Sequence, residues 1–213
     1  DCTVVHNGYA PVPTRGEADE LTNWGLEPGR YLLTVGRLVP EKAVDDLVAA
    51  FRASDATWKL VIVGESSHTD DFAVQVTDAV GDDSRIILAG RVFGAPLDAL
   101  YRYAGGFALT SRLEGLPVVL LEAVGYGLPL IVSDIAPNLE VVGGDGPGHR
   151  VVRVGDVAAF TAAIELLISG PDAERRLDQR FREKVLAEFN WSRAAETTLG
   201  VYREMTGHST ERP

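Results

Sequence analysis

The sequence predicts an α/β fold built on one doubly wound parallel sheet of about six strands. Short, unbroken runs rich in Val, Ile and Leu recur along the chain, as in strands that are buried on both faces. Helical patterns separate these runs, and parallel strands joined through a helix follow a right-handed crossover. After residue 155 the pattern changes to helices alone. We therefore expect a single domain over residues 1–213, with its last helices appended to the sheet.

The expected elements follow from these periodicities. Strands are predicted at Tyr31–Val35, Lys59–Val63, Arg85–Leu88, Phe107–Thr110, Leu130–Ser133 and, with a weaker pattern, Arg150–Val154. The helices between them are predicted at Glu41–Ala53, Asp70–Val80, Pro96–Tyr103 and Val118–Tyr126. The helices after residue 155 are predicted at Asp156–Ile168, Asp172–Glu188 and Ser192–Met205. The last one forms a closing helix within residues 190–206, and residues 207–213 are expected to fray, as chain ends often do.

The composition limits the classes of partner. The chain carries 31 acidic and 20 basic residues, a net charge of −11, which repels phosphate backbones and excludes nucleic acid as a partner. Its longest apolar stretches, such as Pro117–Leu121, fall far short of the about 20 residues that span a membrane, so we expect no membrane-spanning segment. Cys2 is the only cysteine and cannot form an internal disulfide, so we expect a cytoplasmic protein.

A ligand site is expected at the carboxyl ends of the strands, where open α/β sheets bind their ligands. Several glycines stand there, and glycine lets a ligand or a loop approach the backbone closely, although glycine after a strand is also ordinary turn chemistry. The segments at these ends are Gly36-Arg37, Gly64-Glu65, Gly90-Arg91-Val92, Ser111 to Glu114 and Ser133-Asp134.

The segment from Ser111 to Ala123 holds the most informative arrangement. Proline favours the first helical position, so a helix is expected to begin near Pro117 and to offer free amides around it to an anion. Glu114 precedes that helix and Glu122 lies within it, so two carboxylates flank a site of phosphate size. Carboxylates accept hydrogen bonds from the hydroxyls of sugars and ribose. Alternatively, acidic residues there merely complement the helix dipole, although a carboxylate in so apolar a helix is costly without a partner.

A second loop supplies the cations. Gly36 to Lys42 follows a predicted strand and opens a predicted helix, so Arg37 and Lys42 can converge on a diphosphate. Arginine suits bidentate contact with phosphate, and lysine acts as a point charge. The alternative is a surface loop with two solvated cations.

Taken together, these segments resemble the C-terminal domain of the retaining glycosyltransferases of family 4. Those enzymes have the GT-B architecture, in which two Rossmann-like domains face a cleft. The matching segments occur in the family's order: Val5-His6-Asn7-Gly8-Tyr9 with V-x-N-G-V; Gly36-Arg37-Leu38…Glu41-Lys42 with G-R-L-x-x-E-K-G; Ser111 to Pro117 followed by Glu122 with S-x-x-E-G-x-P and E-x7-E; Gly127 to Asp134 with G-x-P-V-I-x-S-D; and Phe189-Asn190-Trp191…Tyr202 with the closing helix.

The resemblance implies a role for each matching residue. Arg37 and Lys42 would neutralise the diphosphate of a nucleotide-sugar donor, Glu114 would contact the transferred sugar and Glu122 the ribose. The base would lie along Arg91-Val92, and amides near Leu116 to Val118 would hold the distal phosphate. The expected catalytic residues are Glu114, Arg37 and Lys42. The expected substrate-binding residues are Gly36, Arg37, Lys42, Arg91, Val92, Glu114, Gly115, Leu116, Pro117, Val118 and Glu122.

The resemblance also implies the wider enzyme. The family retains the anomeric configuration and uses no metal in the active site, so no metal and no cofactor besides the sugar donor is expected. The acceptor would be held by an N-terminal domain, and this chain begins about where that domain would end. It would then bind donor without turning it over. Ala43 departs from the family pattern, which has glycine after the lysine, and so the backbone there is expected to lie farther from phosphate.

Two other functions stay open at this point. One is a sugar-nucleotide epimerase of the GT-B fold, which needs acid–base residues and elimination of the nucleotide; the arrangement of cations and carboxylates favours transfer instead. The other is a non-catalytic module that binds nucleotides or a partner.

Overall fold

A computed structural model describes residues 3–10, 15–66, 70–170 and 176–206. Its centre is a six-stranded parallel sheet in the order β3-β2-β1-β4-β5-β6, which confirms the predicted fold class. The strands are β1 (Tyr31–Val35), β2 (Lys59–Val63), β3 (Ile86–Gly90), β4 (Gly106–Leu109), β5 (Leu130–Ser133) and β6 (His149–Val152). The α-helices are α1 (Val44–Ala53), α2 (Asp70–Val80), α3 (Gly94–Arg102), α4 (Val118–Tyr126), α5 (Ala136–Val142), α6 (Val157–Ser169), α8 (Gln179–Glu188) and α9 (Trp191–Thr206), and two 3-10 helices are η1 (Ala18–Trp24) and η2 (Pro40–Lys42).

Several predicted boundaries are wrong by one or two residues. β3, β4 and β6 start or end away from the predicted Arg85–Leu88, Phe107–Thr110 and Arg150–Val154. The helix predicted over Pro96–Tyr103 begins earlier, at Gly94, and the one over Asp156–Ile168 is shifted by one residue. Such ends depend on a few hydrogen bonds that apolar periodicity does not encode.

Other predictions differ more. The helix predicted from Glu41 is divided, because Ala43 adopts left-handed dihedrals (φ 47°, ψ 41°) that end η2 before α1 begins. The described helix α8 begins at Gln179. The predicted start of this helix, Asp172, falls within residues 171–175, which lie outside the described part of the chain. α5, with Pro137 in its first turn, was not predicted. The tail at 207–213 also lies outside the described residues.

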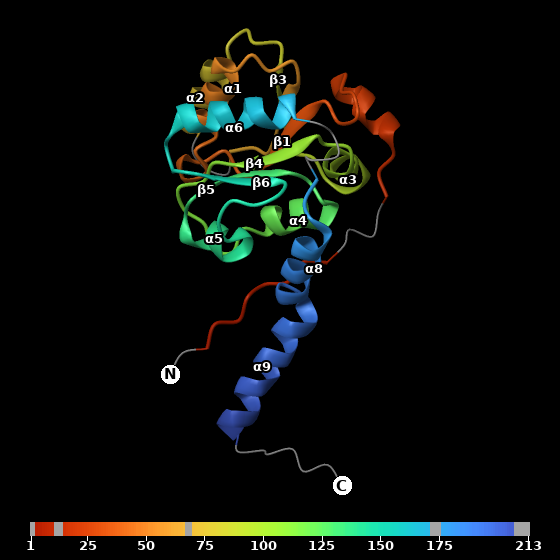
Figure 1. Ribbon diagram of the computed structural model, residues 1–213, viewed down its shortest axis with the longest axis vertical. Helices are drawn as coiled ribbons and strands as arrows, with labels where there is room; N and C mark the ends of the chain where they lie inside the picture. Colours follow the sequence, from red (N-terminus) through yellow and green to blue (C-terminus); the bar gives the residue numbers. More distant parts are fainter. Residues whose placement is uncertain (1–2, 11–14, 67–69, 171–175, 207–213) are drawn as a thin grey trace.

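Helices cover both faces of the sheet (Figure 1), and a hydrophobic core lies between the helices and each face. Strand side chains alternate between the faces: Leu33 and Val61 point into the core beneath α3, α4 and α5, while Leu32 and Leu60 point into the core beneath α1, α2 and α6. Strands buried on both faces explain why the sequence shows continuous apolar runs instead of alternation.

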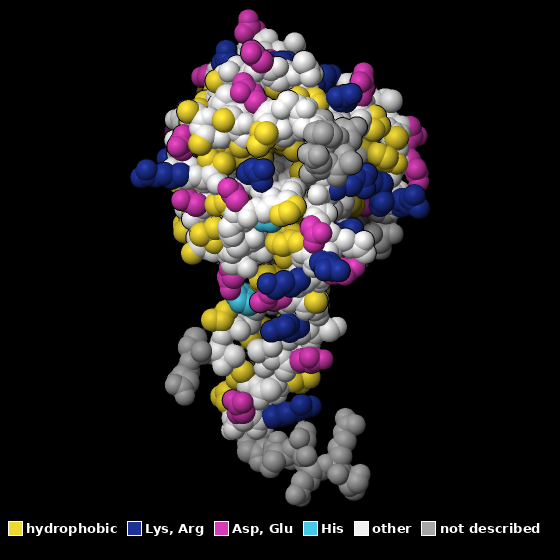
Figure 2. Space-filling model, in the orientation of Figure 1, with side chains coloured by type: hydrophobic (Ala, Val, Ile, Leu, Met, Phe, Trp, Pro, Cys, Tyr) yellow, Lys and Arg dark blue, Asp and Glu magenta, His cyan; other side chains and the backbone are white. Residues whose placement is uncertain are grey.

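The last helix, α9, stands away from the body of the domain (Figure 1). Its described residues, Trp191–Thr206, include none that is buried, and Trp191, Tyr202 and Met205 are exposed large hydrophobic side chains. The space-filling view shows apolar, basic and acidic side chains mixed along this helix (Figure 2). The N-terminal segment reaches its base, where the Tyr9 amide donates to the Phe189 carbonyl at 2.9 Å. No described helix is both long and apolar enough to cross a membrane.

A buried carboxylate ties α3 to its surroundings. Asp98, 2% exposed, accepts hydrogen bonds from the Gly16 amide at 2.7 Å, from the guanidinium of Arg102 at 2.9 Å and from the hydroxyl of Tyr126. Burial opposes ionisation, but these donors together hold the pKa of Asp98 below its ordinary value. The network joins the segment around Gly16 and the C-terminal end of α4 to α3.

Candidate functional site

A pocket of about 530 Å³ opens at the carboxyl ends of β1, β2 and β3, beside α4. The strand order reverses between β1 and β4, so this pocket lies at the topological switch point, where open α/β sheets bind ligands. Its polar side chains include Arg37, Glu65, Arg91 and Glu122, and apolar side chains such as Val119 complete the wall.

Two glycines, Gly36 and Gly64, belong to the lining of the pocket. Gly64 adopts φ 147°, and a Cβ atom on it would lie 1.7 Å from the carbonyl oxygen of Gly36. The loops are hydrogen-bonded to each other: the Gly36 amide donates to Val63 at 2.9 Å, and the Leu38 amide donates to Glu65 at 3.0 Å. The glycine after β2, Gly64, is therefore required by a close approach of two backbones, beyond ordinary turn preference, whereas a Cβ on Gly36 would make only ordinary contacts with Lys42.

Arg37 supplies an available positive charge. Its side chain is exposed and lines the pocket, and no described residue pairs with its guanidinium or accepts a hydrogen bond from it. Arg91 is engaged differently, since it lies 3.2 Å from Glu65 and 4.7 Å from the centre of the Phe93 ring. The pocket thus offers a cation that pairs with no described residue, and an aromatic ring capped by an arginine.

The two remaining charged residues predicted for the site meet each other. Lys42 Nζ donates to both carboxylate oxygens of Glu114, at 2.6 and 2.7 Å, and Ser111 Oγ donates to the same carboxylate at 2.7 Å. The side chains are 18% and 7% exposed. The sequence assigned Lys42 to phosphate and Glu114 to sugar; in the structure they form one nearly buried ion pair. The aliphatic part of the Lys42 side chain lies against Gly36, because a Cβ atom on Gly36 would be 3.9 Å from Lys42 Cδ. Gly36 lines the pocket and Lys42 and Glu114 do not, so the ion pair lies beside the pocket.

Several bonds hold the Glu114 loop on the loop of Lys42. The Arg112 amide donates to the carbonyl of Glu41 at 2.8 Å, and its guanidinium lies 2.7 Å from Asp46 on α1. Thr110, at the end of β4, donates to the carbonyl of Ala43 at 2.9 Å. Ala43 itself has a left-handed backbone conformation, which glycine adopts without strain. It stands at the position where the family pattern has glycine.

Glu122 lies half-buried on α4 and lines the pocket. Tyr101 on α3 donates a hydrogen bond of 2.7 Å to its Oε2 atom. Burial raises the pKa of the Glu122 carboxyl above its ordinary value, and the hydrogen bond from Tyr101 opposes that shift. An acidic side chain in an apolar helix is thus explained in part by a tyrosine on the neighbouring helix.

The start of α4 differs slightly from its prediction. Pro117 is the residue before the helix, which begins at Val118, and the first intrahelical bond runs from the Leu120 amide to the Pro117 carbonyl. The helix amides that precede this bond are those of Val118, which lies in the predicted range Leu116 to Val118, and of Val119, one residue beyond it.

The structure therefore divides the predicted site. Gly36, Arg37, Arg91, Val92 and Glu122 share the pocket, whereas Lys42 and Glu114 pair beside it. Another pocket, of about 320 Å³, is lined by Gly115 and Leu116 together with the N-terminal segment around His6 and Asn7.

Three pocket or support residues were missed by the site prediction. Glu65 follows β2, so the strand-end rule pointed to it without giving it a role. Phe93 and Tyr101 precede and lie on α3, and their positions depend on tertiary contacts that have no local signal in the sequence. Among the described residues, no group of three or more His, Cys, Asp or Glu side chains could hold a metal ion, and the expectation of a metal-free site stays a prediction.

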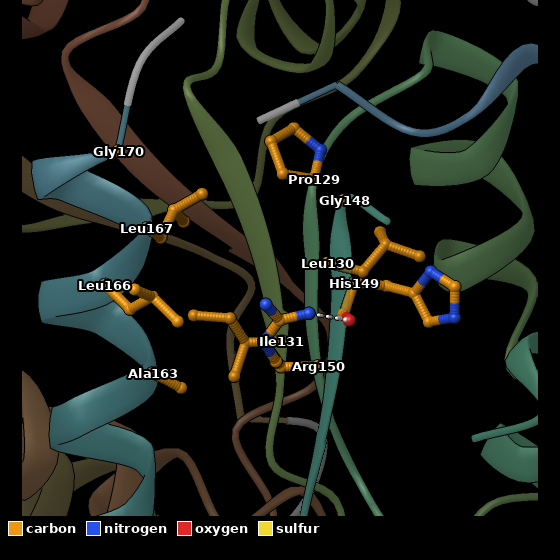
Figure 3. Close-up of a pocket in the computed structure, with 10 residues that line it drawn as sticks. All are labelled: Pro129, Leu130, Ile131, Gly148, His149, Arg150, Ala163, Leu166, Leu167 and Gly170. Carbon is orange, nitrogen blue, oxygen red and sulfur yellow. Dashed lines mark hydrogen bonds between the residues drawn. The ribbon is translucent and has the colours of Figure 1, made fainter. Parts of the chain in front are cut away.

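A further pocket, of about 140 Å³, lies at the opposite, amino-terminal ends of β5 and β6 (Figure 3). Leu166, Leu167 and Ala163 of α6 point into it, and Arg150 donates to the carbonyl of His149 at 3.0 Å. A mainly hydrocarbon lining with its one arginine already bonded to backbone does not suit a charged ligand.

Comparison with known proteins gives consistent matches. Residues 22–184 match the family model described as "Glycosyl transferases group 1". The chain is 28% identical over 220 aligned residues to alpha-maltose-1-phosphate synthase of Mycobacterium tuberculosis, covering 95% of this chain and 56% of that protein. It is 32% identical over 178 residues to glycogen synthase of the same organism, covering 80% and 42%. The structure of sucrose-phosphate synthase from Thermosynechococcus elongatus superposes with a TM-score of 0.78 at 25% identity, covering 96% of this chain and 53% of that one. The chain thus spans about half the length of the proteins it matches.

Proposed function

The chain belongs to the group 1 glycosyl transferases, and from that premise we propose that residues 1–213 form the donor-binding C-terminal domain of a retaining enzyme of the family 4 type. It adopts the α/β fold of GT-B glycosyltransferases. In this proposal the ligand is a nucleotide-diphosphate sugar, the acceptor is held by an N-terminal domain of the full-length protein, and neither a metal nor another cofactor takes part. We expect the full-length enzyme in the cytoplasm.

The observation that carries the proposal is the pocket at the switch point of the sheet. It combines the guanidinium of Arg37, which pairs with no described residue, the closely packed glycines Gly36 and Gly64, and the half-buried carboxylate of Glu122. A nucleoside diphosphate carries the complementary groups: charged phosphates for the arginine and ribose hydroxyls for the carboxylate. The ring of Phe93, with Arg91 over it, offers a flat surface on which a base can stack.

The chemistry assigned to these residues is charge stabilisation. The bond between the sugar's anomeric carbon and the diphosphate breaks, and the acceptor oxygen forms its new bond to that carbon on the same face. The leaving phosphate takes the acceptor's proton. Negative charge therefore develops on phosphate, next to Arg37, Lys42 and the free amides of Val118 and Val119.

The ion pair of Lys42 and Glu114 adds a detail to this assignment. Because one carboxylate receives both Lys42 and Ser111, Glu114 keeps few free acceptor positions for sugar hydroxyls while the pair is intact. In the proposal, Lys42 swings from Glu114 to the diphosphate when donor binds, and the released carboxylate receives hydroxyls of the transferred sugar.

A thermal-shift panel of UDP, GDP, ADP and their common sugar conjugates, each at millimolar concentration, tests the proposal. At tenfold excess over the dissociation constant, bound ligand adds about 1.4 kcal/mol of stability. For a domain of this size, that is a rise in melting temperature of roughly 3–5 °C. We expect one base to give this rise, in the presence of EDTA as well as in its absence.

Two variants make the panel specific. Arg37→Ala should lose about 1.5–3 kcal/mol of diphosphate binding, the range for a charge-assisted hydrogen bond. Arg193→Ala, which removes an exposed arginine on α9, is the matched control and should bind as the unchanged protein does. A flat panel, or equal binding by both variants, contradicts the proposal. Turnover of donor by this chain alone contradicts the assignment of the acceptor to another domain.

A further inference from the structure

Tyr101 is a polar residue held in an apolar setting. Its side chain on α3 is only 2% exposed. Its ring stacks between those of Phe107, at 5.9 Å and 21°, and Tyr126, at 5.2 Å and 7°. A ring packed on both sides has one accessible rotamer, so the direction of its hydroxyl is fixed.

The hydroxyl of Tyr101 is directed at the carboxylate of Glu122. It donates at 2.7 Å to Oε2, and this is the hydrogen bond that the described part of the chain gives that carboxylate. No cation of the described residues lies within ion-pair distance of Glu122. Burial raises the pKa of Tyr101 well above its ordinary value, so the phenol stays protonated and remains a donor throughout the working pH range.

Among the described residues, Glu122 consequently has a hydrogen-bond donor on one oxygen atom only. An ionised carboxylate has about four acceptor positions, and the Tyr101 hydroxyl fills one of them. The residue lines the same pocket as two other groups: Arg37, assigned to phosphate, and Phe93, whose ring is assigned to the base. The part of a nucleotide between its phosphate and its base is the ribose.

We propose that Tyr101 is a positioning residue, which holds Oε2 of Glu122 so that the other oxygen atom faces the ribose hydroxyls of the bound nucleotide. This inference rests on the proposed function and deepens it, because it assigns discrimination between ribonucleotides and deoxyribonucleotides to a contact between α3 and α4. Tyr101 itself does not touch the ligand.

The variant Tyr101→Phe removes one hydroxyl and keeps the stacked ring. Its binding is measured by calorimetry with UDP, GDP and ADP, with their 2′-deoxy and 3′-deoxy counterparts, and with inorganic pyrophosphate. The affinity of the preferred ribonucleotide should fall about tenfold, as when a charge-assisted hydrogen bond is lost. Affinities for pyrophosphate and for the deoxy counterparts should change less than twofold, so the preference for ribose collapses.

Tyr126→Phe is the matched control. Tyr126 belongs to the same aromatic stack, but its hydroxyl donates to Asp98 and not to Glu122. The control should therefore keep the native preference for ribose. Equal loss of ribonucleotide and pyrophosphate in Tyr101→Phe indicates a merely structural role and overturns the inference, as does a variant that binds like the native chain. If the native chain binds no nucleotide at all, the proposed function fails and this inference fails with it.

A measurement on the native chain covers the case in which Tyr101→Phe does not fold. The ¹³C carboxyl signal of Glu122 should show a hydrogen–deuterium isotope effect from the Tyr101 hydroxyl, both before and after addition of the ribonucleotide. The signal should shift when the ribonucleotide is added and stay in place with pyrophosphate. Loss of the isotope effect on binding, or a signal that ignores the ribonucleotide, overturns the inference.

Discussion

The ion pair between Lys42 and Glu114 gives the sharpest test of the site's geometry. The perturbation is a double-mutant cycle with Lys42→Met, Glu114→Gln and both together. Exposed ion pairs contribute about 0.2–1 kcal/mol, and removing one partner of a buried pair destabilises by about 3–5 kcal/mol. Here the lysine is 18% exposed and the glutamate 7% exposed, and both carboxylate oxygens are bonded. This burial places the pair between exposed and buried ion pairs, and we expect a coupling free energy of about 2 kcal/mol between Lys42 and Glu114.

The two single variants should differ in cost. Lys42→Met leaves a nearly buried carboxylate with the Ser111 hydroxyl as its remaining donor, so it should destabilise more, by about 2–4 kcal/mol. Glu114→Gln leaves a lysine that is partly solvated and should destabilise less. The assay is urea unfolding at neutral pH without ligand. The slope of the unfolding free energy against urea concentration, the m-value, should be the same in all variants. A coupling below about 0.5 kcal/mol, within the additivity of distant sites, refutes the reasoning.

Three further changes test other parts of the account. Gly64→Ala should destabilise by about 2–6 kcal/mol, because its Cβ would meet the Gly36 carbonyl and the backbone is strained there; Gly29→Ala, which has positive φ without a clash, should lose only about 1–2 kcal/mol in the same urea assay. Glu122→Gln should raise the melting temperature at pH 7.5 and not near pH 4, because the raised folded pKa of this carboxyl means that stability is lost as pH rises through it. Asp98→Asn should destabilise at neutral pH, and the difference should shrink in melts below pH 4, because a lowered folded pKa means that stability is lost as pH falls through it.

The sheet was predictable because its strands are buried on both faces. β1, β2 and β5 begin and end at the predicted residues, and each consists mainly of Val, Ile and Leu. The short helix α5 was missed, since seven residues with a proline in the first turn give little periodicity. The division of the first helix at Ala43 was also missed, because left-handed backbone at alanine has no signature in composition.

The sequence predicted which segments contain the charged residues of the site, but not which of their side chains contact each other. Strand ends and glycines pointed to the loop of Arg37, and the pair of carboxylates between Ser111 and Ala123 pointed to Glu122 on α4; Arg37 and Glu122 line one pocket. The bond between Lys42 and Glu114 joins residues 72 apart in sequence, and the bond between Tyr101 and Glu122 joins different helices. Such contacts depend on how loops pack in three dimensions, so a motif identifies the charged residues without saying which of them neutralise each other.

The most direct test of the central claim is an amide NMR titration with the nucleotide that gives the largest thermal shift. The account predicts that the largest shift changes fall in the loops after β1 and β2, at Gly36 and Gly64, and at the first amides of α4, Val118 and Val119. Amides beside the opposite pocket, such as that of Leu166, should stay in place. Changes concentrated around Leu166, or no saturable change at the carboxyl ends of the strands, would contradict the assignment of this chain as a donor-binding domain.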